Sequence, residues 1–176
     1  MDQTGLTHAV ERLADITTRW PAIQALMAAG PAATPALRAG LSHRHASVRR
    51  ACCVVLDHYL DDAAVPELLA NVAHRNRKVR AWALHALACD RCKEGDCRPG
   101  AGEVVPLVLD RLDHDPSARV RRMAVVLASE YLDAPGIAAA LARVSNDDPH
   151  PTVRRLAAYF APGGNGYQRK LGSPPA

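Results

Sequence analysis

The sequence predicts an all-α fold in which helix pairs stack into a solenoid. The main observation is a dipeptide that recurs at the head of apolar stretches, as Val48-Arg49, Val79-Arg80, Val120-Arg121 and Val153-Arg154. The intervals are 31, 41 and 33 residues, and a period of this length is typical of stacked helical repeats. Composition agrees, because hydrophobic residues make up 48% of the chain and aromatic residues only 4%. A core of Ala, Leu and Val suits closely packed helices.

Each of these valines begins the apolar stripe of a helix. Further apolar residues follow at helical spacing, as in Val79, Trp82, Ala83, Ala86 and Leu87. A stripe of this width indicates a helix that is buried between neighbours. A shorter helix is expected before each of the first three, because a proline lies 13 or 14 residues ahead of the valine, at Pro35, Pro66 and Pro106. Proline is favoured in a first helical turn, where its missing N–H costs no hydrogen bond.

The two ends of the chain lack this repeat. At the N-terminus, apolar residues from Leu6 to Ile16 recur at helical spacing and predict a helix that ends at Trp20-Pro21, with a second short helix to about Ala29. We interpret residues 1–32 as capping helices. Residues 162–176 are rich in Gly and Pro and have no period, which predicts a flexible tail.

The sequence also bears on location. The chain begins without a basic segment followed by an apolar run, and no stretch approaches the roughly 20 apolar residues that span a bilayer. We therefore expect a cytoplasmic protein without membrane contact, at 176 residues a single domain. In that reducing compartment stable disulfides are rare.

Three segments resemble HEAT repeats, specifically the short bacterial type that is also found in phycobilisome lyases. They are Ala64 to Leu69, Val104 to Leu109, and the Asp-x-Asp-Pro-x-x-x-Val-Arg-Arg run from Asp113 to Arg122. The resemblance covers residues 33–161 and divides them into repeats at 33–60, 61–90, 103–132 and 135–161. It implies a right-handed α-solenoid of about four to five helix pairs, of a family whose members are mostly non-enzymatic binding scaffolds.

The resemblance also implies a ladder of ion pairs. The family usually pairs an Asp in the turn between two helices with the Arg that follows the valine, which here would join Asp115 to Arg121 and Asp148 to Arg154. The first two repeats carry His43 and His74 at the position of the Asp. This departure leaves Arg49 and Arg80 without the usual carboxylate.

A cysteine-rich insertion at 89–102 accounts for the longest interval. Its three cysteines follow His85 in an H-x3-C-x2-C-x4-C pattern, and the four residues His85, Cys89, Cys92 and Cys97 match the ligands that tetrahedral Zn²⁺ prefers. His58 is an alternative fourth ligand, because stacked repeats would place it beside Cys89. Four protein ligands make a structural zinc site. The alternative interpretations of the three cysteines are free thiols, a Cys92–Cys97 disulfide and an iron–sulfur cluster.

The turns of the first two repeats are basic. They contain no acidic residue within residues 38–50 and 74–80, and the candidate partner-binding residues there are Arg44, Arg49, Arg50, Arg75, Arg77, Lys78 and Arg80. The acids of this region lie at the opposite turns. Since turns of one kind align in a solenoid, we expect a basic edge that attracts an acidic protein or nucleic acid phosphate, unless it is only a solvated face.

Three functions remain open at this point. The first is a non-enzymatic module that binds a protein partner, since no catalytic constellation is recognisable. The second is a nucleic-acid-binding protein that resembles HEAT-like alkylpurine DNA glycosylases, although no aromatic and carboxylate pair can be assigned and Trp20 and Trp82 are interpreted as core residues. The third, a bilin lyase or accessory role, rests on the family resemblance alone. The oligomeric state is not predictable.

Overall fold

The computed structural model describes residues 1–59, 61–88 and 99–171, and among them it contains helices and turns but no strand. The chain divides into two compact units, Met1–Pro99 and Gly100–Ala176. Within the described residues no helix is long and apolar enough to span a bilayer.

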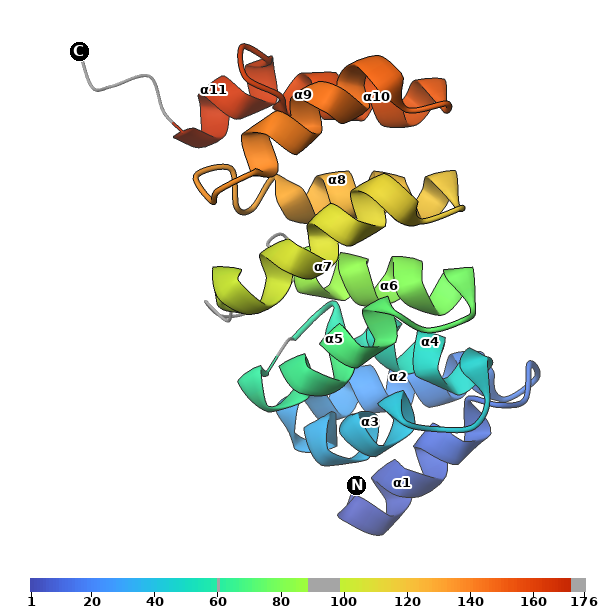
Figure 1. Cartoon of the computed structure of the whole chain (residues 1–176). Coiled ribbons are helices and arrows are strands. Elements are labelled where there is room, and N and C mark those ends of the chain that lie inside the picture. The colour runs from blue at the N-terminus through green and yellow to red at the C-terminus, as the bar shows by residue number, and fades with distance from the viewer. Residues whose placement is uncertain (60, 89–98, 172–176) are drawn as a thin grey trace. The chain divides into compact units, whose positions relative to one another are not determined.

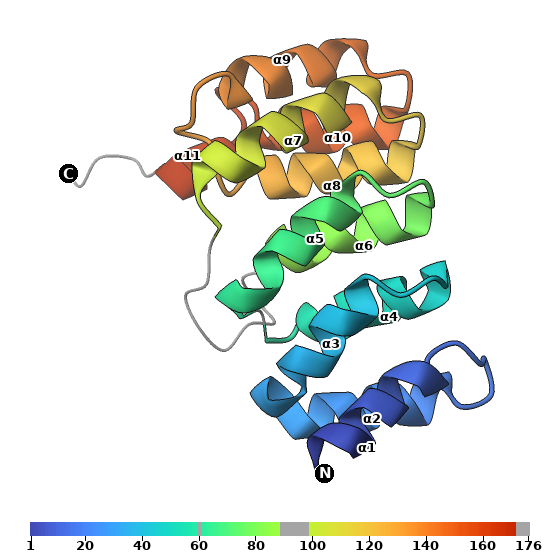
Figure 2. The same cartoon turned by 60° about the horizontal axis from the view of Figure 1, so that its bottom comes forward.

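Unit 1 consists of three helix pairs (Figure 1). Their bounds are α1 Gln3–Arg12 with α2 Arg19–Ala29, α3 Thr34–Leu41 with α4 Ala46–Leu56, and α5 Val65–Val72 with α6 Arg77–Ala88. Short 3-10 turns, Gly30–Ala33 and Asp62–Ala64, precede α3 and α5. Helix α4 packs against α2 and α6, and α3 packs against α1 and α5, so the pairs stack in two layers. The turns inside the three pairs lie along one edge of the unit (Figures 1 and 2).

Unit 2 consists of two helix pairs and a final helix. Their bounds are α7 Ala101–His114 with α8 Ala118–Ala128, α9 Ile137–Asp147 with α10 Pro151–Phe160, and α11 Asn165–Leu171. Helix α7 begins inside the expected insertion. The described residues thus hold five helix pairs in two stacks, and the predicted all-α repeat fold with four to five pairs is confirmed.

Helix α11 lies in the segment that the sequence marked as a flexible tail. Gly163 supplies a left-handed turn at φ 86°, and α11 then packs against α10. Gly166 fits against the ring of Tyr159, where a Cβ would collide with it. Lys170 forms an ion pair with Glu130. Contacts with α10 therefore order a segment whose own composition favours disorder.

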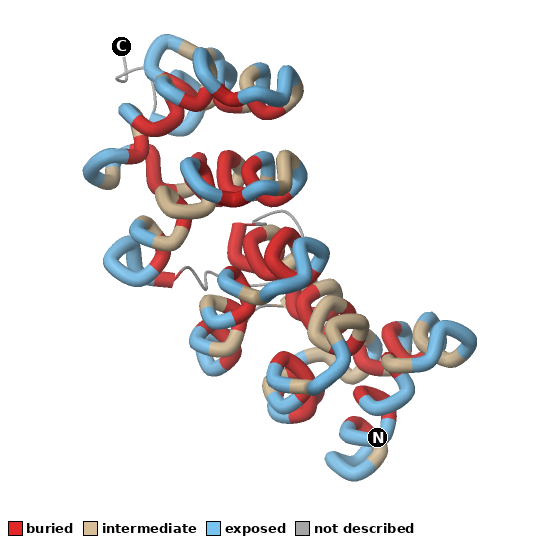
Figure 3. The backbone as a smooth tube through the Cα atoms, turned by 45° about the vertical axis from the view of Figure 1, so that its right-hand side comes forward, coloured by how far each residue is buried: buried red, intermediate tan, exposed pale blue. Residues whose placement is uncertain are grey.

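The core is formed by the first and second helices of the pairs together, and buried segments are drawn red in Figure 3. The four valines of the Val-Arg dipeptides are fully buried, and each contributes about 1.5–3 kcal/mol of transfer free energy. Cys52 and Cys53 lie in the core of α4, as small core residues, and burial raises the pKa of Cys53 to about 12. Their thiols are protonated and inaccessible.

The first helix pair departs from the prediction. Helix α1 ends at Arg12, and Asp15 then accepts the Thr17 N–H at 2.8 Å to form a turn that contains Ile16. Helix α2 begins at Arg19, so Pro21 belongs to its first turn and does not separate two helices. Pro35 and Pro66 lie in the first turns of α3 and α5 as predicted. Pro106 lies inside α7, which begins at Ala101, so the prediction that a short helix starts at Pro106 is wrong. As a result Trp20 is 64% exposed and Ile16 78% exposed, and the interpretation of Trp20 as a core residue is wrong.

Candidate functional site

The four Val-Arg helices begin with one shared turn. In each, the Arg is the fourth helical residue and donates to the carbonyl oxygen six residues earlier: Arg49 to His43 at 2.6 Å, Arg80 to His74 at 2.9 Å, Arg121 to Asp115 at 2.8 Å and Arg154 to Asp148 at 2.6 Å. The side chain of that earlier residue accepts the backbone N–H two residues further on, over 2.8–3.0 Å. This arginine therefore belongs to the fold in every repeat.

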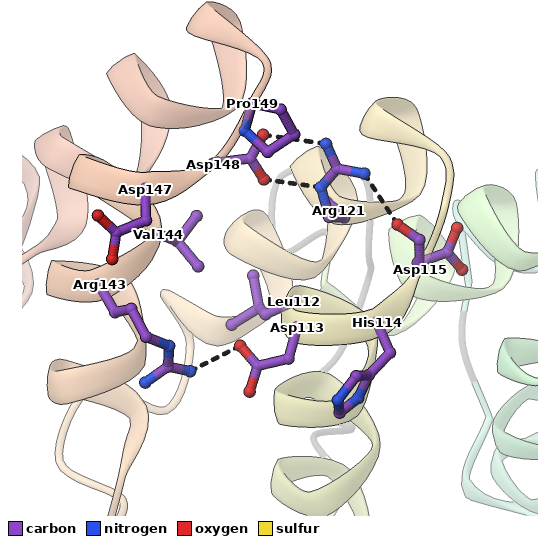
Figure 4. A pocket seen from close by; sticks show the side chains of 10 residues that line it. All are labelled: Leu112, Asp113, His114, Asp115, Arg121, Arg143, Val144, Asp147, Asp148 and Pro149. Atoms are coloured by element: carbon purple, nitrogen blue, oxygen red, sulfur yellow. Dashed lines mark hydrogen bonds and ion pairs between the residues drawn. The ribbon is translucent and has the colours of Figure 1, made fainter.

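In unit 2 this turn also carries an ion pair between successive helix pairs. Arg121 donates two hydrogen bonds to the Asp148 carboxylate, at 2.7 and 3.0 Å, and both residues are buried (Figure 4). Burial raises the pKa of Asp148, but the hydrogen bonds from Arg121 and from the His150 N–H outweigh it and hold that pKa below its ordinary value. Arg121 keeps its charge.

The ladder pairing expected from the family resemblance is thus shifted by one repeat. Arg121 binds the backbone carbonyl of Asp115 and the carboxylate of Asp148, whereas Arg154 binds only the Asp148 backbone carbonyl among the contacts described. The Asp115 carboxylate lies 3.6 Å from Arg111. Side chains near a helix start lean back toward the preceding turn, and there the guanidinium reaches across to the turn of the next pair.

In unit 1 a neutral amide takes the place of that carboxylate. One N–H group of the Arg49 guanidinium donates a hydrogen bond to the side-chain oxygen of Asn71, Oδ1, over 3.3 Å. The buried Asn71 amide nitrogen donates in turn to the backbone carbonyls of Leu41 and Glu67. His74 sits in the turn where unit 2 has Asp148. Burial, then the charges of Arg49 and Arg75, lower the pKa of His74, so it stays neutral. Within the described residues Arg49 forms no ion pair.

The seven predicted partner-binding cations divide into two groups. Arg49, Arg50 and Arg80 are half-buried or buried and are held by the fold. The other four are exposed, and their side chains make no hydrogen bond or ion pair in the part of the chain that the structure describes; they are Arg44, Arg75, Arg77 and Lys78. All four come from the α3–α4 and α5–α6 turns or the first residues of α6, at one edge of unit 1 (Figure 2). These four residues, together with Ile16 and Trp20, are called the turn surface below.

Trp20 was missed by the sequence reasoning, although a signal for it exists. It is the second residue of α2, the register position that Ser47 occupies in α4 and Lys78 in α6. The buried stripe of α2 begins only afterwards, with Ala22, Ile23 and Leu26. The proline itself gives no such signal, because Thr34 and Val65 also precede a first-turn proline and are buried.

Of the predicted metal ligands, only two lie within the described residues. Cys89, Cys92 and Cys97 lie outside them, and residues 1–59, 61–88 and 99–171 contain no group of three potential ligands. His85 directs Nε2 toward the buried Asp57, 3.5 Å from Oδ2, and its buried Nδ1 forms no hydrogen bond within the described chain. His58 is half-buried and follows Asp57 directly, just beyond α4.

Unit 2 holds a cleft of about 280 Å³ between the ends of α7 and α9 and the start of α8 (Figure 4). Its charges are largely matched. Arg121 pairs with Asp148, and Arg143 pairs with Asp113 at 2.6 Å. Both ion pairs join the first helix pair of unit 2 to the second, so the cleft is explained by the packing of the repeats.

Comparisons with known proteins agree with this architecture. A family model described as HEAT repeats matches residues 4–88 and 65–161, whereas no curated protein matches the sequence. The fold is similar to that of a designed armadillo repeat protein, with 16% identity, a TM-score of 0.54 and coverage of 94% of this chain and 86% of that one. A designed armadillo repeat protein in complex with the peptide (KR)4 is similar over the same shares, with 16% identity and a TM-score of 0.56.

Proposed function

The chain belongs to the family of HEAT repeat proteins, and from this premise we propose that it is a non-enzymatic interaction module that binds an acidic protein partner through the turn surface of unit 1. HEAT and armadillo folds are typical of protein-interaction scaffolds. Since a fold does not define a partner, the proposal rests on the residues of the surface.

The observation that carries the proposal is an exposed tryptophan at the same edge of unit 1 as four unpaired cations. Trp20 is 64% exposed and Ile16 is 78% exposed, and leaving large apolar side chains in water is unfavourable. Tryptophan and arginine are the residues most often found at the energetic centres of protein interfaces. The four exposed cations lie in turns and a helix start that contain no acidic residue, although Asp15 lies beside Ile16 in the α1–α2 turn and Glu11 lies 3.4 Å from His43. Together they fit an acidic segment that also presents an apolar side chain.

The sign of the charge distinguishes this surface from that of a structural relative. The designed armadillo repeat protein described above was solved with (KR)4, a basic peptide. The turn surface would instead attract an acidic peptide, because its own exposed charged residues are positive. Nucleic acid is the competing ligand for such charges, through phosphate contacts whose strength falls steeply with salt.

The experiment is a binding titration with a defined acidic probe. We would titrate a Glu- and Leu-containing peptide and follow both its fluorescence anisotropy and the Trp20 emission. The double variant Arg75→Glu/Lys78→Glu should weaken binding roughly tenfold or more. A matched control is Arg155→Glu/Arg169→Glu, which reverses two exposed cations of unit 2, and it should change the affinity less than about twofold.

The outcomes separate the two partner classes. If duplex DNA or single-stranded RNA binds more tightly than the peptide, and the same double variant abolishes that binding, the partner is nucleic acid and the proposal is wrong. If the test and control variants behave alike with every probe, the turn surface is a solvated face.

We propose in addition that a structural zinc ion is held by His85, Cys89, Cys92 and Cys97. The spacing of the ligands in the sequence supports this. So does the orientation of His85, because a metal-bound histidine commonly donates its other ring N–H to a carboxylate, and Asp57 stands at Nε2 while Nδ1 lacks a partner in the described chain.

Native mass spectrometry of the purified protein tests the zinc site. We expect one zinc per chain, its loss in Cys92→Ser and in His85→Asn, and a melting temperature that falls by several degrees with it, because a structural zinc contributes folding free energy. His45→Asn, which removes an exposed histidine, should keep the metal. A chain that carries no zinc, or variants that retain it, would contradict the proposal.

A further inference from the structure

Unit 2 contains a second concave site, and its lining differs from that of the cleft in Figure 4. It lies between the start of α8 and the start of α10, has a volume of about 350 Å³, and is lined by Ala118, Arg119, Arg122, His150 and Thr152. No carboxylate lines it. The neighbouring carboxylate of Asp148 is bound by Arg121.

The side chains around this site are hydrogen-bond donors. Arg119 and Arg122 are both exposed, and neither side chain makes a hydrogen bond or ion pair within the described part of the chain. His150 Nδ1 accepts the backbone N–H of Thr152 at 3.3 Å and contacts its hydroxyl at 2.8 Å. Because Nδ1 accepts an N–H, the ring proton of neutral His150 is on Nε2, which is then a donor.

Backbone N–H groups at the start of α8 add further hydrogen-bond donors to the site. Ala118 is the first residue of α8, and the N-cap residue, Ser117, makes no side-chain hydrogen bond to the first turn. The first-turn N–H groups of this 11-residue helix therefore have no side-chain acceptor, and the positive end of the helix dipole lies at the site. Each guanidinium group at such a helix start can donate two parallel hydrogen bonds to phosphate oxygens.

We propose that this pocket binds a phosphate group. The ligand is defined by what surrounds it: two unpaired arginines from one helix, an imidazole N–H from another, and no competing carboxylate. It shares no residue with the turn surface of unit 1 and does not depend on the function proposed for that surface. The phosphate group could belong to a phosphorylated side chain of a partner or to free phosphate, and the same titration distinguishes them.

The test is an NMR titration at constant ionic strength. Three probes are added in turn to ¹⁵N-labelled protein: sodium phosphate, a phosphoserine peptide, and the same peptide without phosphate, with sodium chloride as the baseline. We expect phosphate-dependent shifts of the amides of Ala118, Arg119 and Thr152. The double variant Arg119→Gln/Arg122→Gln should weaken the binding roughly tenfold or more, while Arg12→Gln/Arg169→Gln, with the same loss of charge, should leave it within twofold.

Every outcome decides something. Tighter binding of the phosphoserine peptide than of inorganic phosphate assigns the site to a phosphorylated partner, and equal binding assigns it to free phosphate. Shifts no larger than those with chloride overturn the proposal, as does equal weakening by both double variants, because the interaction would then reflect net charge alone. An unchanged melting temperature of the test variant confirms that a lost signal is not a lost fold.

Discussion

The turns of the two units have one shape and two chemistries. In unit 2 the residue that closes the turn is an aspartate, Asp115 or Asp148, and in unit 1 it is a histidine, His43 or His74. All four accept the same backbone N–H at nearly the same distance. The comparison shows that the turn needs only a hydrogen-bond acceptor. The negative charge that usually comes with it is a separate property.

The absence of the negative charge in unit 1 affects both the hydrogen bonds of the ladder arginine and the net charge of the edge. In unit 2 Asp148 neutralises Arg121, so the ladder arginine adds no net charge to the edge. In unit 1 the equivalent Arg49 is held at 3.3 Å by the neutral amide of Asn71, a longer hydrogen bond than the charged one in unit 2. The exchange of Asp for His weakens the ladder and leaves the edge basic, which is the property that the proposed acidic partner needs.

The largest expected effect comes from breaking the charged ladder of unit 2. Asp148→Asn should lower the free energy of unfolding by about 3 kcal/mol at pH 7, because it leaves Arg121, 8% exposed, without its counter-ion. Chemical denaturation measures this. Asp113→Asn, which removes the exposed partner of Arg143, is the matched control and should cost less than about 1 kcal/mol. Equal losses in the two variants would mean that burial of the pair is irrelevant.

The reverse exchange in unit 1 should have a smaller effect of opposite sign. In His74→Asp, a carboxylate would accept the Asn76 N–H as histidine does and would also pair with Arg49. We expect the free energy of unfolding to rise by about 1 kcal/mol, measured by chemical denaturation. The same variant should weaken binding of the acidic probe, since it adds a negative charge to the turn surface. A destabilised His74→Asp would show that the histidine has a packing role that aspartate cannot replace.

The pH dependence of stability offers a smaller and more specific difference. The pKa of His74 is lowered from 6.5 in the folded chain by burial and by Arg49 and Arg75. Its neutral form therefore favours folding above pH 6.5, and this contribution is lost as the pH falls below 6.5 and the unfolded chain takes up the proton first. His74→Asn should reduce the fall in stability between pH 7 and pH 5 relative to the native chain. Identical slopes would mean that His74 titrates normally.

How far the sequence predicts this molecule depends on the kind of inference. The Val-Arg period located the four second helices. The apolar stripe of each helix and the hydrogen bond from its arginine to a carbonyl six residues earlier both involve residues that are close together in the sequence. The ladder partner of Arg121 was placed one repeat too early, since local spacing does not tell which neighbouring turn a long side chain reaches. Trp20 was misplaced because one proline is compatible with a helix end or a helix start. The pocket at Arg119 and Arg122 required the packing of α8 beside α10, which no local pattern contains.

The smallest expected effect on stability is at Trp20, and it separates binding from folding. Trp20→Ser should change the free energy of unfolding by less than about 0.5 kcal/mol, because most of the side chain is already in water. Leu26→Ala, in the same helix and fully buried, should cost about 3 kcal/mol. If Trp20→Ser were as costly as Leu26→Ala, Trp20 would belong to the core after all. A variant that folds normally yet loses the acidic probe would instead place the tryptophan, like the basic turns, among the residues that unit 1 keeps for a partner at little cost to its own stability.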